Sequence, residues 1–213
     1  MENRKTYDQF CPLATALDYV GERWTILILR ELLGGPARFN ELRHGLQSIP
    51  SNLLVTRLKR LEEDGLVYLS TSQGGSLYSL TEQGASIRKA LDTLAFWGAR
   101  LNYISTPKYE RSIRAISMAL NAILSVISDN LPEERLVINL EVDNENLEIV
   151  LSKSPIVTAR ISIDADVKLK ISKKDISYLL NGNSFEKGMI SYVSGSEEVC
   201  EKFENIFETV FSR

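Results

Sequence analysis

Residues 48–80 read SIPSNLLVTRLKRLEEDGLVYLSTSQGGSLYSL, and two different periodicities follow each other in this stretch. Leu54, Leu58 and Leu61 recur at helical spacing, which predicts a helix with an inward apolar side. Two short β-prone runs around Gly74-Gly75 then predict a hairpin. A helix that leads directly into a hairpin is typical of the last part of a winged helix-turn-helix.

The side of this helix opposite the leucines carries hydrogen-bond donors. Such side chains suit base edges and phosphate oxygens, so we interpret this side as a DNA-reading face. Arg57 lies nearer the leucine side on the helical wheel, which favours an ion pair within the protein over a base contact. Ser48 or Ser51 is expected to cap the helix start. The predicted DNA-contacting residues of the helix are Ser51, Asn52, Thr56, Lys59 and Arg60.

Three helices are predicted before this one. The spacing of apolar residues and the glycines that follow them place these helices at about 12–20, 22–33 and 39–46. The third would form the helix-turn-helix pair with the DNA-reading helix. Because residues 1–103 carry a net charge of only +1, DNA binding must depend on local clusters of positive charge. The further members of such a cluster are Arg38, Arg43 and His44.

Composition and motif content exclude several classes of protein. The chain has 213 residues, 44% hydrophobic and 25% charged, which is typical of a soluble protein with two modest domains. No apolar run is long enough to cross a bilayer and the N-terminus lacks a signal core, so we expect a cytoplasmic protein without a membrane partner. One histidine and two cysteines assemble no catalytic, metal or cofactor site, so we expect no enzyme.

The segment from Cys11 to about Tyr103 resembles the HxlR-type family of winged-helix transcriptional regulators. The resemblance implies a homodimer that binds double-stranded DNA at a near-palindromic operator. Wings in this family are usually longer and often basic, whereas residues 66–80 contain no Lys or Arg. The matching motifs are CPLATALDYVGERWTILILREL, GPARFNELRHGL, LLVTRLKRLEEDGLV and YSLTEQG.

Thr81 is expected to cap a long helix that continues to about Tyr103. The family resemblance implies that this helix and the first one form the dimer interface, although both could instead pack within the chain. A cysteine near the N-terminus senses electrophiles or oxidants in some family members, so Cys11 is a possible redox sensor; the alternative is a small buried residue. The residues assigned to dimerisation are Leu13, Leu17, Leu91, Leu94, Trp97 and Leu101.

Ser105-Thr106-Pro107 marks a predicted boundary between a domain at 1–104 and a second at 108–213. The second domain is expected to form an antiparallel meander followed by a fifth strand, with helices covering the sheet. The expected helices are 108–129, 172–180 with Ser172 as cap, and 196–211; the expected strands are 136–142, 147–151, 156–163, 167–171 and 189–193.

This order of elements, in the α+β class, resembles the sterol-carrier-protein-like fold through VKLKISKKDISYLLNG, FEKGMISYVSG and VCEKFENIFETVF. The resemblance implies an apolar cavity for a small hydrophobic effector, with a solid core as the alternative. The residues that would line either one are Val199, Phe203, Ile206, Phe207, Val210 and Phe211.

The leading hypothesis is therefore a dimeric DNA-binding transcriptional regulator whose second domain binds an apolar effector or stabilises the dimer. The alternative is a lipid-binding or carrier protein whose winged helix serves protein interaction. The donor-rich face of the helix at 51–63 favours the first hypothesis, because an interaction module has no need of such a face.

Overall fold

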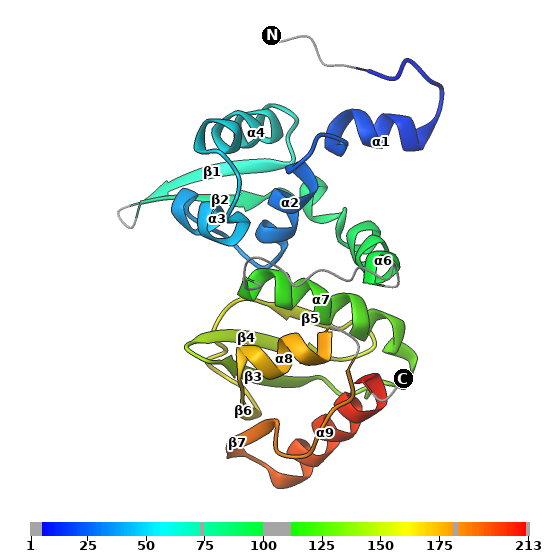
Figure 1. The fold of residues 1–213 in the computed structure, drawn as a ribbon, viewed down its shortest axis with the longest axis vertical. Helices are drawn as coiled ribbons and strands as arrows, with labels where there is room; N and C mark the ends of the chain where they lie inside the picture. Colours follow the sequence, from blue (N-terminus) through cyan, green and yellow to red (C-terminus); the bar gives the residue numbers. More distant parts are fainter. Residues whose placement is uncertain (1–5, 73–74, 100–111, 181–182, 212–213) are drawn as a thin grey trace. The chain divides into compact units, whose positions relative to one another are not determined.

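The computed structural model describes residues 6–72, 75–99, 112–180 and 183–211. It divides into two compact units, Met1–Leu91 and Asp92–Arg213 (Figure 1). The predicted domain boundary at 105–107 and the predicted dimer residue Leu101 lie outside the described residues.

The first unit contains the helix-turn-helix and the wing that the sequence predicts. Two of its helices, α1 and α3, have the bounds expected from apolar spacing. The next helix, α2, begins later than expected because Trp24 has a left-handed φ of 84° and so cannot extend the helix. The elements are α1 Pro12–Val20, α2 Thr25–Leu33, α3 Phe39–Leu46, α4 Ser51–Glu63, β1 Val67–Ser72, β2 Gly75–Leu80, α5 Glu82–Ala85 and the start of α6 Arg88–Ala99.

The apolar stripe of α4 forms part of the core of this unit. Leu54, Leu58 and Leu61 are almost completely buried, together with Ile28 and Leu29 of α2. Burying such side chains stabilises the fold by about 1.5–3 kcal/mol each. The opposite side of α4 is thereby held toward solvent.

The predicted cap at the start of α4 is wrong. Neither Ser48 nor Ser51 caps it; Pro50 is the N-cap residue and no side chain accepts a hydrogen bond there. Proline fits this position because its fixed φ suits the helix entry, and the first N–H groups have no partner within the helix.

The single long helix predicted from Thr81 is also wrong, because the chain forms two helices, α5 and α6. The Thr81 cap is confirmed: its hydroxyl accepts a hydrogen bond from Gly84 N at 3.0 Å and donates to Gly65 O at 2.6 Å. A Cβ at Gly84 would lie 1.9 Å from the carbonyl oxygen of Leu66, so α5 lies directly against the chain that enters the wing. The first residue of the next helix, Arg88, is held separately: its guanidinium donates a hydrogen bond to Leu33 O.

The second unit is a five-stranded sheet with helices packed on one face. Ser172 caps α8 as predicted, its hydroxyl accepting from Asp175 N. The predicted strand at 156–163 is shorter than expected. The elements are α7 Ile113–Val126, a 3-10 turn Ser128–Asn130, β3 Leu136–Val142, β4 Glu145–Leu151, β5 Ile156–Thr158, β6 Val167–Ile171, α8 Lys173–Leu180, β7 Ile190–Gly195 and α9 Glu197–Phe211.

The sheet is mixed, so the expected antiparallel meander is wrong. Its order is β5-β4-β3-β6-β7, and β6 pairs in parallel with β3. The cause is the connection at 159–166, which runs back along the sheet so that β6 adds to the free edge of β3. Two side chains hold this connection to the sheet: Ser162 N donates to Asn139 Oδ1 at 2.9 Å, and Arg160 pairs with Glu148.

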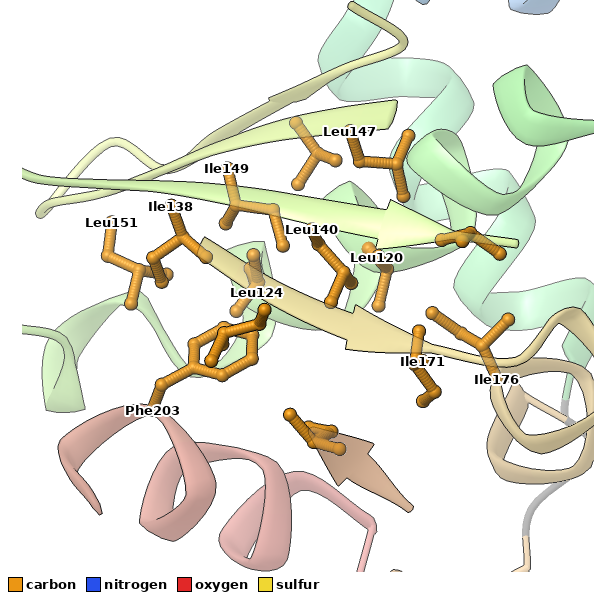
Figure 2. Close-up of a cluster of buried hydrophobic side chains, with 14 of the residues drawn as sticks. Leu120, Leu124, Ile138, Leu140, Leu147, Ile149, Leu151, Ile171, Ile176 and Phe203 are labelled. Atoms are coloured by element: carbon orange, nitrogen blue, oxygen red, sulfur yellow. The ribbon is translucent and has the colours of Figure 1, made fainter. Parts of the chain in front are cut away.

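Alternate residues of the strands face the helices and form the core of the second unit. The pattern is clearest in β6, where Val167, Leu169 and Ile171 are buried and the two lysines between them are exposed. Figure 2 shows this cluster with Phe203 of α9 directed into it. None of the helices in the described part of the chain is long and apolar enough to cross a membrane.

Candidate nucleic-acid interface

The outward side of α4 presents neutral polar groups at its start and charged groups at its end. Ser51, Asn52 and Thr56 are exposed, and the Thr56 hydroxyl donates to the carbonyl oxygen of Asn52 at 3.0 Å. The Lys59 side chain is 76% exposed. Asn52, Thr56 and Lys59 share the face opposite the leucines, as their spacing predicts, whereas Ser51, the first residue of the helix, lies nearer the leucine side.

Acidic side chains accompany the basic residues in the last turns of α4. Lys59 Nζ lies 3.9 Å from Glu63 Oε1, and the guanidinium of Arg60 lies 3.7 Å from Glu63 and 3.6 Å from Asp64. The Arg60 side chain is partly buried and directed toward the C-terminal end of the helix by these contacts. Both basic side chains at this end of α4 therefore lie beside acidic groups, and Lys59 is the more exposed of the two.

The ion pair predicted for Arg57 is confirmed. Its Nη2 lies 2.8 Å from Glu22 Oε2. Glu22 belongs to the corner between α1 and α2, where the guanidinium of Arg23 lies 5.7 Å from the centre of the Trp24 ring. The pair thus connects α4 to the corner that follows α1.

Replacing Glu22 with glutamine is expected to lower the free energy of unfolding by no more than about 1 kcal/mol, because one partner is exposed and water screens the pair. Replacing Arg57 with alanine should cost more, since its half-buried stem is also lost. Urea denaturation at low and high salt measures both. If Glu22→Gln cost as much as Arg57→Ala at both salt concentrations, the packing role of the Arg57 stem would be refuted.

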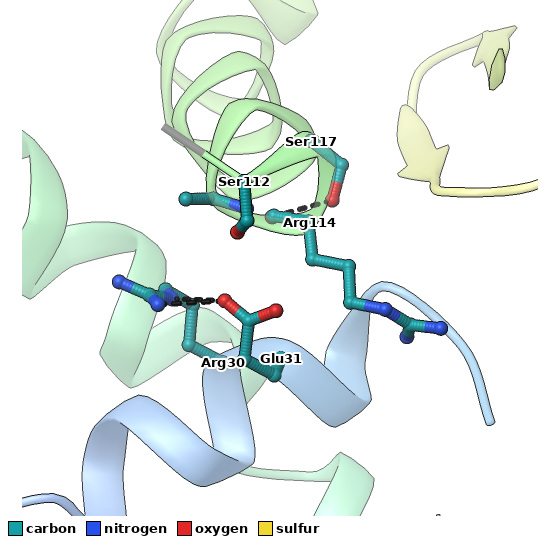
Figure 3. Close-up of polar contacts among 6 residues, drawn as sticks. Arg30, Glu31, Ser112, Arg114 and Ser117 are labelled. Carbon is teal, nitrogen blue, oxygen red and sulfur yellow. Dashed lines mark hydrogen bonds and ion pairs between the residues drawn. The ribbon is translucent and has the colours of Figure 1, made fainter. Parts of the chain in front are cut away.

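Helix α2 contains a buried charge that sequence patterns did not reveal. Glu31 is wholly buried, and its carboxylate pairs with Arg30 at 2.6 Å (Figure 3). A Cβ at Gly45 would lie 2.3 Å from Glu31 Oε2, so a larger residue at this position of α3 would have to displace the buried carboxylate of Glu31. The apolar run of α2 gave no signal for this arrangement.

The basic residues of α3 are exposed, as expected for phosphate contacts. Arg43 and His44 lie in its last turn, and Arg38 precedes its first residue. The backbone N–H of Arg38 donates to Glu41 Oε2 at 2.7 Å. These side chains and the α4 face come from neighbouring elements of one helix-turn-helix.

The wing is joined to α3 by its backbone. Ala37 and Tyr78 exchange hydrogen bonds of 3.0 Å and 2.9 Å, which adds residue 37 to the edge of the β1–β2 hairpin. Burial, and secondarily the negative charge of Glu62, raise the pKa of Tyr78, so its phenol stays neutral above the ordinary range. The described residues contain no cluster of His, Cys, Asp or Glu that could hold a metal ion.

Comparison with known proteins identifies the family. The model of the HxlR-like helix-turn-helix matches residues 19–106. The regulator YdeP of Bacillus subtilis is 33% identical over 110 residues, which cover 47% of this chain and 86% of YdeP. The chain belongs to the HxlR-like helix-turn-helix family. Regulator Rv3095 of Mycobacterium tuberculosis is 44% identical over 86 residues, 39% of this chain and 54% of that protein.

Both relatives are described as HTH-type transcriptional regulators. Among solved structures, quinone-bound YodB from B. subtilis is 30% identical over 43% of this chain and 100% of that chain, with a TM-score of 0.39. The HxlR-like match ends at residue 106, so the five-stranded sheet, which begins with β3 at Leu136, lies outside it.

Most residues assigned to dimerisation are exposed in this HxlR-like chain. Leu13 of α1 is 68% exposed and Leu17 is also exposed; in α6 the same holds for Leu94 and for Trp97, which is 58% exposed. Leu91 is different, because it is 3% exposed and belongs to the core. It therefore contributes to folding of the chain itself.

Cys11 is a free thiol at the N-cap of α1, intermediate in exposure. Its carbonyl oxygen accepts a hydrogen bond from the Thr15 hydroxyl at 3.2 Å. The other cysteine, Cys200, is buried in the core of the second unit. Of the two, Cys11 is the one that solvent reaches.

Proposed function

We propose that this protein is a homodimeric transcriptional regulator that binds a near-palindromic DNA site with α4 in the major groove. The main support is the donor-rich, exposed side of α4, held outward by its buried leucines in an HxlR-like helix-turn-helix. Asn52 and Thr56 would face base edges, and Lys59 a phosphate. In a dimer the two α4 helices would lie about 34 Å apart, which is one turn of DNA.

Affinity in this proposal comes from few charges. Arg38, Arg43, His44, Lys59 and Arg60 are the basic residues proposed to face phosphates; Lys59 and Arg60 both lie beside Glu63, and Arg60 also lies beside Asp64. With about four to six phosphate contacts per subunit, log affinity should fall with log salt by about 0.9 per contact. Binding should accordingly be strongly salt-dependent.

Two single substitutions in α4 test the DNA face in opposite directions. Lys59→Ala should weaken binding about five- to tenfold for all sequences and reduce the salt slope by about one per subunit. Glu63→Gln should strengthen binding, because it removes the carboxylate that lies beside Lys59 and Arg60. Fluorescence anisotropy on DNA from upstream of the protein's own gene, at two salt concentrations, measures both.

Glu82→Gln, a matched charge change in α5, is the control for the effect of net charge alone. It should change affinity less than Glu63→Gln does. Equal binding by the wild type and Lys59→Ala, or no binding to the DNA offered, would refute the assignment of α4 as the DNA-binding helix.

The proposal extends to the second unit as a sterol-carrier-protein-like domain that binds a small apolar effector. Its support is the sheet with α7, α8 and α9 packed against one apolar face, together with the motifs that resemble that fold. An effector would alter DNA affinity only by binding the DNA-competent and incompetent states unequally. Cys11, at the start of α1, is a second candidate for regulation, because modification of its thiol by an electrophile or oxidant would change DNA affinity.

A further inference from the structure

The wing of this protein carries no positively charged side chain of its own. Strands β1 and β2 and the residues between them, 67–80, contain no Lys or Arg. Because the wing follows α4 after only a short turn, seating α4 in the major groove brings the hairpin close to the adjacent backbone and minor groove. Any cation that meets the DNA there must come from another part of the chain.

Arg38 places its guanidinium at the wing. A Cβ built on Gly75, the first residue of β2, would lie 3.8 Å from Arg38 Nη1 and 3.9 Å from Cζ. Gly75 has a φ of +103°, so larger residues are disfavoured at the position that the guanidinium borders. The side chain of Arg38 is also exposed to solvent.

The backbone on both sides of Arg38 is fixed. The backbone of Ala37 exchanges hydrogen bonds with Tyr78 in β2, and the N–H of Arg38 donates a hydrogen bond to the Glu41 carboxylate in the first turn of α3. A side chain that starts from a fixed backbone loses less freedom when it binds a ligand, which favours binding. Arg38 is therefore held beside the wing, although in the sequence it precedes α3.

We propose that Arg38 replaces the missing basic residue of the wing and enters the DNA minor groove beside the site bound by α4. Narrow minor grooves of A·T-rich DNA have an enhanced negative potential that attracts arginine. The exocyclic N2 amino group of guanine lies in the minor groove of G·C pairs and obstructs such a contact. The protein therefore prefers operators with A·T-rich flanks. This inference rests on the proposed DNA-binding function.

The test uses the full-length protein and a short duplex that spans its footprint on DNA from upstream of its own gene. In a second duplex, 2,6-diaminopurine replaces adenine in the flanks, which adds an amino group to the minor groove and leaves the major-groove pattern of hydrogen-bonding groups unchanged. The wild type should bind the modified duplex about five- to tenfold more weakly. Arg38→Ala should bind both duplexes with the same reduced affinity.

Arg43→Ala is the matched control, because it removes an exposed arginine from the last turn of α3, five residues after Arg38. It should weaken binding to both duplexes and retain the five- to tenfold preference. A preference that survives in Arg38→Ala, with an unchanged melting temperature, overturns the inference and leaves the proposed function intact. Failure of the wild type to bind the upstream DNA overturns both.

Discussion

Replacing Phe203 with alanine is expected to lower the free energy of unfolding of the second unit by about 3–5 kcal/mol. Phe203 is completely buried, and Figure 2 shows its ring directed from α9 toward Leu124 and Ile138. Alanine would remove both the buried apolar surface and the contacts that fill the space between α9 and the sheet. Partial collapse around the site would recover only some of this loss.

Urea denaturation followed by far-UV circular dichroism measures the change, and hydrogen exchange assigns it to β3, β4 and β6. Phe203→Leu should cost less than about 1.5 kcal/mol because it largely conserves volume. Ile163→Ala, at a position that is 88% exposed in the connection at 159–166, should change stability by no more than about 0.5 kcal/mol. A loss below about 1 kcal/mol for Phe203→Ala would mean that the ring borders open space, and would favour the ligand-cavity interpretation.

Local sequence signals predicted the elements well where periodicity and caps act within one element. The spacing of apolar residues gave the bounds of α1, α3, β3 and β6, and Thr81 and Ser172 cap helices as expected. The wheel position of Arg57 likewise indicated an ion pair, which Glu22 supplies. These features depend on residues a few positions apart, or on one side of one helix.

Features that depend on distant parts of the chain could not be predicted. The parallel pairing of β6 with β3 is set by the connection at 159–166, and no local pattern encodes its path. The short helix α5 lies against the chain that enters the wing, through the close approach of Gly84 to Leu66, and α6 begins separately. At the DNA face, spacing placed Arg60 outward, but contacts with Glu63 and Asp64 hold it near the helix end.

The location of Arg38 beside the wing illustrates the same limit. Its sequence position, before α3, indicates only a general phosphate contact. The bridge between Ala37 and Tyr78 is what brings the guanidinium to Gly75 of β2. A sequence pattern that counts basic residues within the hairpin therefore underestimates the charge available to the wing.

Placing two acidic residues on α1 by Leu13→Glu/Leu17→Glu is expected to convert the proposed dimer to a monomer and weaken operator binding by about 10²–10⁴-fold. Both side chains are exposed and lie at i, i+4 on one side of the helix. In a two-fold interface they would bury four like charges without partners, at a cost that association cannot offset. DNA affinity would fall because each monomer would bind its half-site independently, without the effective concentration that a linked second subunit provides.

Trp97→Glu in α6 tests the second proposed dimer helix independently and should have the same effect. Sedimentation equilibrium gives the subunit association, and anisotropy on intact and half operators gives the DNA affinity. Thr15→Glu adds a charge to an exposed position on the opposite side of α1 and should leave both unchanged. Monomeric variants should bind a half operator as well as the wild type does, because α4 is untouched. If the α1 double variant remains a dimer, its exposed leucines serve another partner and the interface must be sought elsewhere on the chain.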